Sequence, residues 1–183
     1  MIKTLKLIMK KLSFISTIAF AFIMLLTTNV HAQKFAKMDK SPLDIAYYKT
    51  DRNSPPMVKV IYSRPQLKGR ALSTLAPNGK VWRTGANEAV EIKFFQDTKF
   101  GGKTVKAGVY SLFTIPGDTE WTIILNKDLD IWGAYNYKEE HDVLRTKGTV
   151  SKDEAVEAFS IAFGKGNMYL AWGTVRVAVP VSK

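Results

Sequence analysis

The sequence predicts an all-β protein, an antiparallel β-sandwich or jelly-roll-like fold that follows a signal peptide and a polar N-terminal arm. Three observations support this prediction. Apolar and polar residues alternate in seven short runs of the 183-residue chain, glycine-rich turns separate several of these runs, and a basic and then apolar segment opens the chain. We expect a signal peptide over residues 1–32, an arm over 33–56 and a single β domain over 57–183.

The first 32 residues have the three parts of a secretory signal peptide. The basic start contains Lys3, Lys6, Lys10 and Lys11 and no acidic residue. The apolar run from Leu12 to Leu26 is shorter than the ~20 residues that span a bilayer. Val30-His31-Ala32 then favours cleavage before Gln33. The sequence therefore predicts an exported protein, periplasmic or secreted, with no transmembrane anchor after cleavage; the alternative is an uncleaved anchor.

The composition excludes several classes of function. The absence of cysteine rules out disulfides, thiolate metal sites and cysteine nucleophiles. No glycine-rich phosphate loop and no H-E-x-x-H motif is present, so we expect no cofactor. Loss of the four leader lysines lowers the basic residues from 27 to 23 against 16 acidic ones, a net charge of +7. An exported basic protein is expected to meet envelope anions rather than nucleic acid, unless its charge serves solubility alone.

The elements of the β domain are expected in the following order. Residues 33–56 are polar and contain Ser41-Pro42 and Ser54-Pro55-Pro56, which is typical of an arm. Strands are expected at 58–63, 90–94, 109–115, 121–126, 159–163, 168–172 and 175–181, where side chains alternate with period two. Turns at 101–102, 116–118 and 164–167 have hairpin spacing. Only Ser151–Ala158 predicts helix, one or two turns long, because Ser151 and Glu154 could form a capping box.

The first candidate ligand-binding segment runs from Trp82 to Glu88. Arg83 offers a planar fork of donors that suits carboxylate, phosphate or sugar hydroxyls. Gly85 permits a positive φ and Asn87 can bond the turn backbone, so a recess formed by Trp82, Arg83, Asn87 and Glu88 is expected. In the alternative interpretation this segment is a structural corner, with Arg83 paired to Glu88 or a carbonyl and Trp82 in the core.

A second candidate segment contains Trp132 and Tyr135, whose rings could stack on sugars or hold a cation. Sheet packing is the alternative role for these rings. Arg70, close to Lys68, could bind an anion or remain a solvated turn charge. Glu88, His141 and Asp142 could serve a hydrolase, but no G-x-S-x-G elbow accompanies His141. Neighbouring residues around His141 cannot easily converge on zinc, so no metal site is expected.

An ordered set of motifs resembles a bacterial family known as domain of unknown function 2911. The matching strings are I-Y-S-R-P (61–65), K-G-R (68–70), P-N-G-K-V-W-R-T-G-A-N-E (77–88), A-G-V-Y-S-L-F-T-I-P-G (107–117), W-T-I-I-L-N (121–126), W-G-A-Y (132–135), D-V-L-R (142–145) and S-P-L-D-I-A-Y-Y (41–48). The resemblance implies an exported, single-domain β protein, and it implies no reaction, cofactor or catalytic residue. The chain departs from the family pattern at A-L-S-T (71–74) and at Asn78, so a pocket lined by the usual aromatics would be smaller here.

Two functions are compatible with these observations. The sequence favours a non-catalytic envelope module that binds a glycan, an anionic ligand or another protein, because export, the β fold and the tryptophan- and arginine-containing segments all fit that role. The alternative is a hydrolase that acts on envelope polymers through acidic residues. No motif predicts an oligomeric state.

Export gives the first testable prediction. Protein recovered from an exporting host should begin at Gln33, because the signal peptidase is expected to cut after Ala32. N-terminal sequencing or intact mass measures this directly. A chain that still begins at Met1 in the membrane fraction would contradict the prediction.

Overall fold

A computed structural model describes residues 2–25 and 33–183 of the chain, which forms two compact units, Met1–Lys37 and Met38–Lys183. In the first unit, helix α1 (Ile2–Leu25) contains the four leader lysines and most of the predicted apolar run. Most of the predicted cleavage site lies outside the described residues. Within the described ranges, no helix has both the length and the apolar character needed to cross a membrane.

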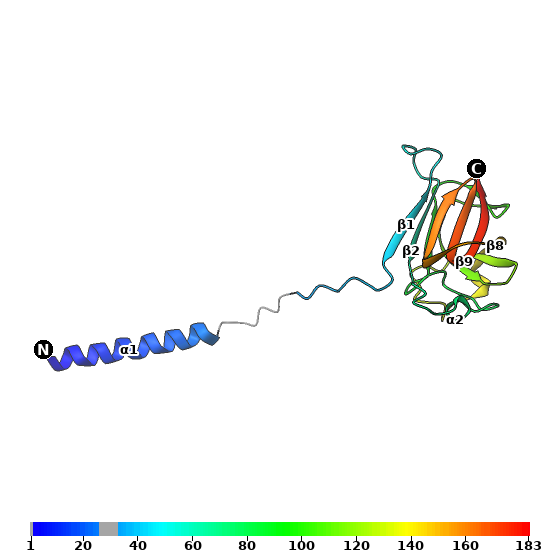
Figure 1. The fold of residues 1–183 in the computed structure, drawn as a ribbon. Helices are drawn as coiled ribbons and strands as arrows, with labels where there is room; N and C mark the ends of the chain where they lie inside the picture. The colour runs from blue at the N-terminus through cyan, green and yellow to red at the C-terminus, as the bar shows by residue number, and fades with distance from the viewer. Residues whose placement is uncertain (1, 26–32) are drawn as a thin grey trace. The chain divides into compact units, whose positions relative to one another are not determined.

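The second unit, as far as the structure describes it, is one antiparallel sheet in the order β1-β2-β3-β6-β7-β8-β9-β4-β5 (Figure 1). The strands are β1 (Leu43–Tyr48), β2 (Val58–Ser63), β3 (Val90–Phe94), β4 (Thr98–Phe100), β5 (Lys103–Val105), β6 (Gly108–Ile115), β7 (Glu120–Asn126), β8 (Asp142–Gly164) and β9 (Asn167–Ser182). A short helix α2 (Leu72–Leu75) and a 3-10 turn (Glu139–His141) lie in the connections. The all-β antiparallel prediction is confirmed.

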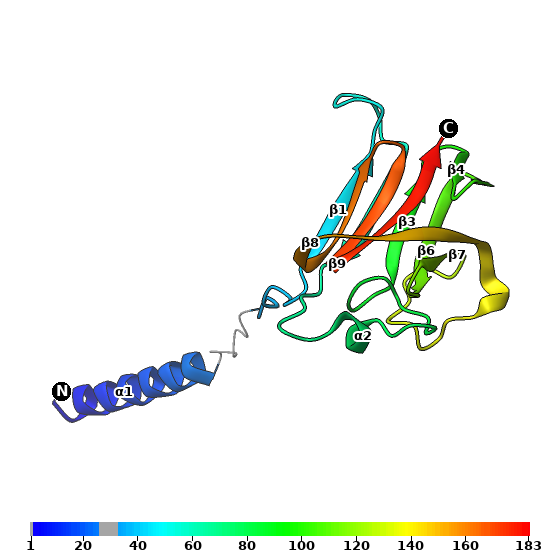
Figure 2. The same ribbon diagram turned by 45° about the vertical axis from the view of Figure 1, so that its right-hand side comes forward.

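The long strand β8 converts this one sheet into two layers. Its register with β9 shifts between Lys152 and Val156 and again before Ser160, and such irregularities bend a strand. The first part of β8, up to Thr149, pairs with β7, and pairing with β9 begins at Thr149. The part after the shifts pairs with β9 and lies near β1. Figure 2 shows the β8–β9 hairpin in front of β1, β3 and β6. The layers are therefore halves of a continuous sheet.

The core lies between these layers and contains a cluster of aromatic rings. Trp82 stacks on Trp172 with ring centroids 5.5 Å apart, and it meets the edge of Phe159 at 5.1 Å. Tyr62 of β2 also contacts Phe159 edge-on. Since large aromatic side chains supply much of the free energy of burial, this cluster is a principal source of stability.

Arg64, immediately after β2, joins the first strands of the sheet to the bent part of β8. Its Nε donates to the Phe159 carbonyl at 3.1 Å and one terminal nitrogen donates to the Ser160 hydroxyl at 2.7 Å. The other terminal nitrogen forms an ion pair with Asp44 of β1 at 3.1 Å. The Tyr62 hydroxyl adds a bond to the Ile161 carbonyl. Arg64 thus satisfies the Phe159 carbonyl, next to the bridge that Gln66 forms with Ala158 of β8.

The seven period-two runs all form strands, with 168–172 and 175–181 joined in β9. The predicted helix at Ser151–Ala158 is wrong, because these residues belong to β8. Ser151 pairs with Arg176, and Val156 pairs with Gly173. Eight residues cannot nucleate an isolated helix easily, so pairing with β9 overrides the local capping signal.

The polar segment 33–56 contains a strand that the sequence pattern did not reveal. Strand β1 pairs along its whole length with β2, from Leu43–Ser63 to Tyr48–Val58. Its burial alternates weakly, with Asp44 on the inner side, so a hydrophobic pattern is absent. The compact unit that begins at Met38 therefore includes part of the predicted arm.

The Arg64 contacts predict a stability effect. Arg64→Ala should lower the free energy of unfolding by about 2 kcal/mol, because it removes hydrogen bonds from a charged donor and leaves the Phe159 carbonyl unpaired. Partial exposure of the Arg64–Asp44 pair, at 35% and 41% of the side chains, keeps the ionic share small. Urea unfolding measures the change. Arg52→Ala, in an exposed turn, is the control, and equal effects of both substitutions would contradict the prediction.

Candidate functional site

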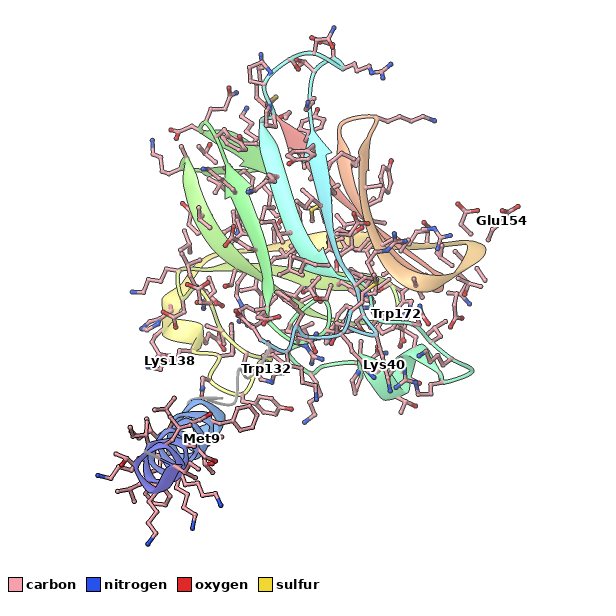
Figure 3. The ribbon with its side chains drawn as sticks, turned by 90° about the vertical axis from the view of Figure 1, so that its left-hand side faces the viewer. Met9, Lys40, Trp132, Lys138, Glu154 and Trp172 are labelled. Carbon is pink, nitrogen blue, oxygen red and sulfur yellow. The ribbon has the colours of Figure 1, made fainter. Side chains whose placement is uncertain are left out.

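Two segments that are distant in the sequence, 82–89 and 131–135, lie together as a short antiparallel ribbon. Glu88 and Trp132 form a β-bridge at its centre. Directly paired residues of an antiparallel ribbon project to the same side, so the Glu88 carboxylate and the Trp132 indole are neighbours. We call these two segments the loop ribbon; Figure 3 labels Trp132 among the loops at one end of the sheet. The structure therefore unites the two predicted candidate segments.

The backbone of the loop ribbon depends on two residues of unusual conformation. Thr84 and Asn87 both have a φ of +61°, and the Asn87 carbonyl accepts a hydrogen bond from the Gly133 N–H at 2.9 Å. The positive φ expected at Gly85 is absent. Gly85 is required for a different reason, because a Cβ there would lie only 3.2 Å from the Ser63 carbonyl oxygen. The loop ribbon thus packs closely on the end of β2.

Trp82 and Arg70 do not join this surface. Trp82 is only 5% exposed and packs against Trp172, which agrees with the interpretation that it belongs to the core. Arg70 is exposed and donates to the carbonyls of Gln66 and Leu67 within its own turn. The candidate surface therefore retains Arg83, Asn87, Glu88, Trp132 and Tyr135.

Beside the loop ribbon, a recess of about 270 Å³ opens on the outer face of the sheet. Its apolar lining comes from Leu43 of β1, Ile61 of β2 and Leu129, which follows β7. Its carboxylates belong to Glu88, Glu91 and Asp130, and its hydroxyls to Ser63 and Ser111. We call this feature the acidic recess. Only Glu88 of this lining was predicted as a site residue.

The two serine residues of the acidic recess are buried. Ser63 is 5% exposed and Ser111 is 3% exposed. The Ser111 hydroxyl donates to the Asp128 carbonyl at 2.6 Å. For the Ser63 hydroxyl, in contrast, the described structure gives no hydrogen bond to another residue, and Ser63 lines the recess. A hydroxyl in this position is available to a ligand.

The missed residues could be assigned a face from the sequence, but not a position. Period two places Ser63 and Glu91 on the outward sides of their strands, and Ser111 likewise on the next strand. Only the pairing of Ile61 with Glu91, and of Glu91 with Ser111, brings these side chains side by side. Strand register of this kind depends on long-range pairing that no local motif encodes.

The aromatic residues of the loop ribbon are unusually accessible. The Trp132 residue is 59% exposed and Tyr135 is 84% exposed. Gly133 between them has a φ of +69°, and a Cβ there would lie 2.7 Å from the Tyr135 ring. A side chain at position 133 would therefore displace Tyr135. The loop presents one indole and one phenol to solvent beside the acidic recess.

Arg83 is half-buried beside Tyr135. Burial lowers the pKa of the Arg83 guanidinium below its usual value, and the nearby Tyr135 hydroxyl acts in the opposite direction. Its Nε is buried without a hydrogen-bond partner in the described structure. No ion pair with Glu88 is present among the described residues, so the expected structural pairing is not what holds Arg83 in place.

A polar network fixes the base of the loop that carries Trp132 and Tyr135. The buried Asn126 side chain donates to Asp142 at 2.9 Å, and the Tyr137 hydroxyl donates to the same carboxylate at 2.6 Å. Burial and the Asp142 carboxylate raise the pKa of Tyr137 above its usual value. Arg145 lies 3.0 Å from Asp142. The Asp142 carboxylate therefore stabilises the base of the loop that carries Trp132 and Tyr135.

His141 has a similar supporting contact. Its Nδ1 lies 2.6 Å from the carboxylate of Asp128, whose carbonyl in turn accepts the Ser111 hydroxyl bond. Neither His141 nor Asp142 lines the acidic recess. In the described part of the chain, no three His, Cys, Asp or Glu side chains are grouped so as to hold a metal ion.

The fold and the site define an all-β domain, formed by one folded antiparallel sheet, with an acidic and aromatic-bordered recess on its outer face. A family model described as "Protein of unknown function (DUF2911)" matches residues 41–181, and the chain belongs to this family. The match runs from just before β1 almost to the end of β9, so the predicted resemblance is confirmed. Comparisons with curated proteins and with solved structures gave no match.

The unpartnered Nε of Arg83 leads to a prediction. Arg83→Met should leave the melting temperature unchanged or raise it slightly, since it keeps the aliphatic packing and removes a partly buried charge that lacks a partner. Arg83→Lys keeps the charge and serves as the comparison. Thermal unfolding monitored by circular dichroism measures both, and a strong drop for Arg83→Met would indicate a structural role instead.

Proposed function

We propose that the protein is a non-catalytic glycan-binding module of the cell envelope, exported by its N-terminal signal peptide. The acidic recess and the loop ribbon form the binding site. The observation that carries the proposal is the exposed Trp132 indole, held opposite Glu88 beside a recess that contains an unpaired serine hydroxyl. Aromatic faces stack on the apolar face of a sugar ring, while carboxylates and hydroxyls hydrogen-bond to sugar hydroxyls.

The environment of the tryptophans supports this assignment. Three of the four, Trp82, Trp121 and Trp172, are buried in the core. Only Trp132 is exposed, and it belongs to a loop whose base is fixed by the Asn126–Asp142 contact. Burial of such a ring is normally favourable, so an indole held rigidly in solvent is a feature of a binding surface.

The chemistry of the site also favours a sugar over the other ligands considered. Three carboxylates in the recess would repel an anion, which disfavours phosphate or an acidic polymer at this place. Of the hydrolase set, only Glu88 lines the recess, because His141 and Asp142 hold the loop. We assign the three recess carboxylates to binding, and the hydrolase alternative is tested by product release below.

The proposal predicts a loss of affinity on removal of the indole. Trp132→Ala should weaken binding to oligosaccharides on a glycan array by about tenfold, which corresponds to about 1.4 kcal/mol for the lost stacking. Phe95→Ala, which removes another partly exposed ring outside the recess, is the matched control and should bind like wild type. Affinities of the purified protein are then measured by calorimetry on the best array ligand.

Two results would contradict the proposal. One is the absence of binding to any oligosaccharide of the array by wild-type protein. The other is an equal loss of affinity for Trp132→Ala and Phe95→Ala. Release of shortened sugar products during the incubation, followed by chromatography, would favour the hydrolase alternative.

A further inference from the structure

The charges of the acidic recess are not balanced by the protein. Glu88, Glu91 and Asp130 line one small recess, and none of them takes part in an ion pair with another described residue. The chain expected after cleavage is basic, with a net charge of +7 from 23 basic and 16 acidic residues. The recess is thus a local group of negative charges on a basic protein, and no described basic side chain forms an ion pair with it.

Ser63 supplies an independent indication of a ligand. This residue is 95% buried by its neighbours, and its hydroxyl lines the recess without a hydrogen-bond partner in the described structure. In the described structure this hydroxyl is not among the fully buried atoms that lack a partner, so it reaches the open space of the recess, where it can hydrogen-bond to a bound polar group. The loop ribbon keeps this hydroxyl in place, because Gly85 packs directly on the Ser63 backbone.

Resting on the proposed function, we propose that the acidic recess selects sugars that carry a protonated amine. An ammonium group has three donors, and the carboxylates and the Ser63 hydroxyl that line the recess are acceptors for them. The apolar lining of Leu43, Ile61 and Leu129 excludes part of the water and so strengthens these charge-assisted bonds. The sugar ring that carries the amine then lies toward Trp132, whose face also attracts a cation.

The volume and composition of the recess fit this ligand. A recess of about 270 Å³ is near the lower end for small-molecule sites, which suits one substituted sugar ring rather than a long polymer segment. No set of three or more potential metal ligands is found among the described residues, so the carboxylates are not arranged as a closed metal cage. An amine held by separated carboxylates requires no such geometry.

Three tetrasaccharides of the same β-1,4 backbone provide the test. Chitosan tetramer carries an amine at C2, chitin tetramer carries an acetamide and cellotetraose carries a hydroxyl. Calorimetry of the purified protein, at a pH at which the amines are protonated, should give about tenfold tighter binding for the chitosan tetramer than for the other two. Raising the salt concentration should reduce this preference, because charge interactions near a surface are screened.

Matched substitutions locate the effect. Glu91→Gln keeps the shape of the side chain and removes one charge, so it should remove most of the preference for the amine. Glu120→Gln, on β7 and outside the recess, should keep the full preference. Ser63→Ala should weaken all three sugars. Circular dichroism of each variant confirms that the fold is retained, since none of these side chains belongs to the core.

The possible results separate the inference from the proposed function. Equal affinity for the three tetrasaccharides, or a preference that Glu91→Gln leaves unchanged, overturns the inference while glycan binding stands. Absence of binding to all three, together with binding to free lysine, overturns both, because the recess would then recognise amines without sugars. The expected result is preferential binding of the amine-bearing tetrasaccharide that depends on Glu91.

Discussion

Arg64 connects the two layers of the folded sheet through one main-chain carbonyl and two side chains. The segment after β2 meets the bent part of β8 at the Gln66–Ala158 bridge, and buried carbonyls next to this bridge are costly unless they have partners. One guanidinium satisfies the Phe159 carbonyl and the Ser160 hydroxyl while it also holds Asp44 of β1. The ring of Phe159, whose carbonyl accepts the Arg64 bond, belongs to the aromatic cluster around Trp82.

The outer face of the sheet is organised from the same closed core. Segment 82–89 begins at the core residue Trp82 and leaves it within a few residues to pack on β2. The partner segment is held at its base by the Asn126–Asp142 contact. Two loops with firmly placed ends can present exposed rings without losing order, which reduces the entropy lost when a ligand binds.

The fold was predictable where a strand buries one side in the core and obscure where it does not. Alternation revealed β2, β3, β6 and β7, because each has one side in the core. It did not reveal β1, because the inward residue Asp44 is charged and forms an ion pair with Arg64. It also suggested a helix in β8, because a bent, exposed part of a strand carries polar residues without a period. In β1 and in the bent part of β8, pairing between strands rather than local sequence preference determines the structure.

The candidate site shows the same limit. Glu88 and Trp132 could be selected from the sequence as separate residues, since an aromatic or a charge beside a glycine turn is a recognisable signal. Their pairing across the loop ribbon, and the placement of Glu91 and Ser63 beside them, follow from contacts between segments far apart in the chain. A single sequence contains no direct record of such contacts.

Tyr62 and Ser63 are adjacent in the chain, yet one side chain faces the core and the other faces the recess. Adjacent positions of β2 thus belong to different surfaces, one to the core and the next to the recess. Outward positions of β2, β3 and β6 can exchange charge, size or polarity while the inward positions stay fixed. Under the proposed function, point substitutions at these outward positions would change the ligand preference without a compensating change in the interior.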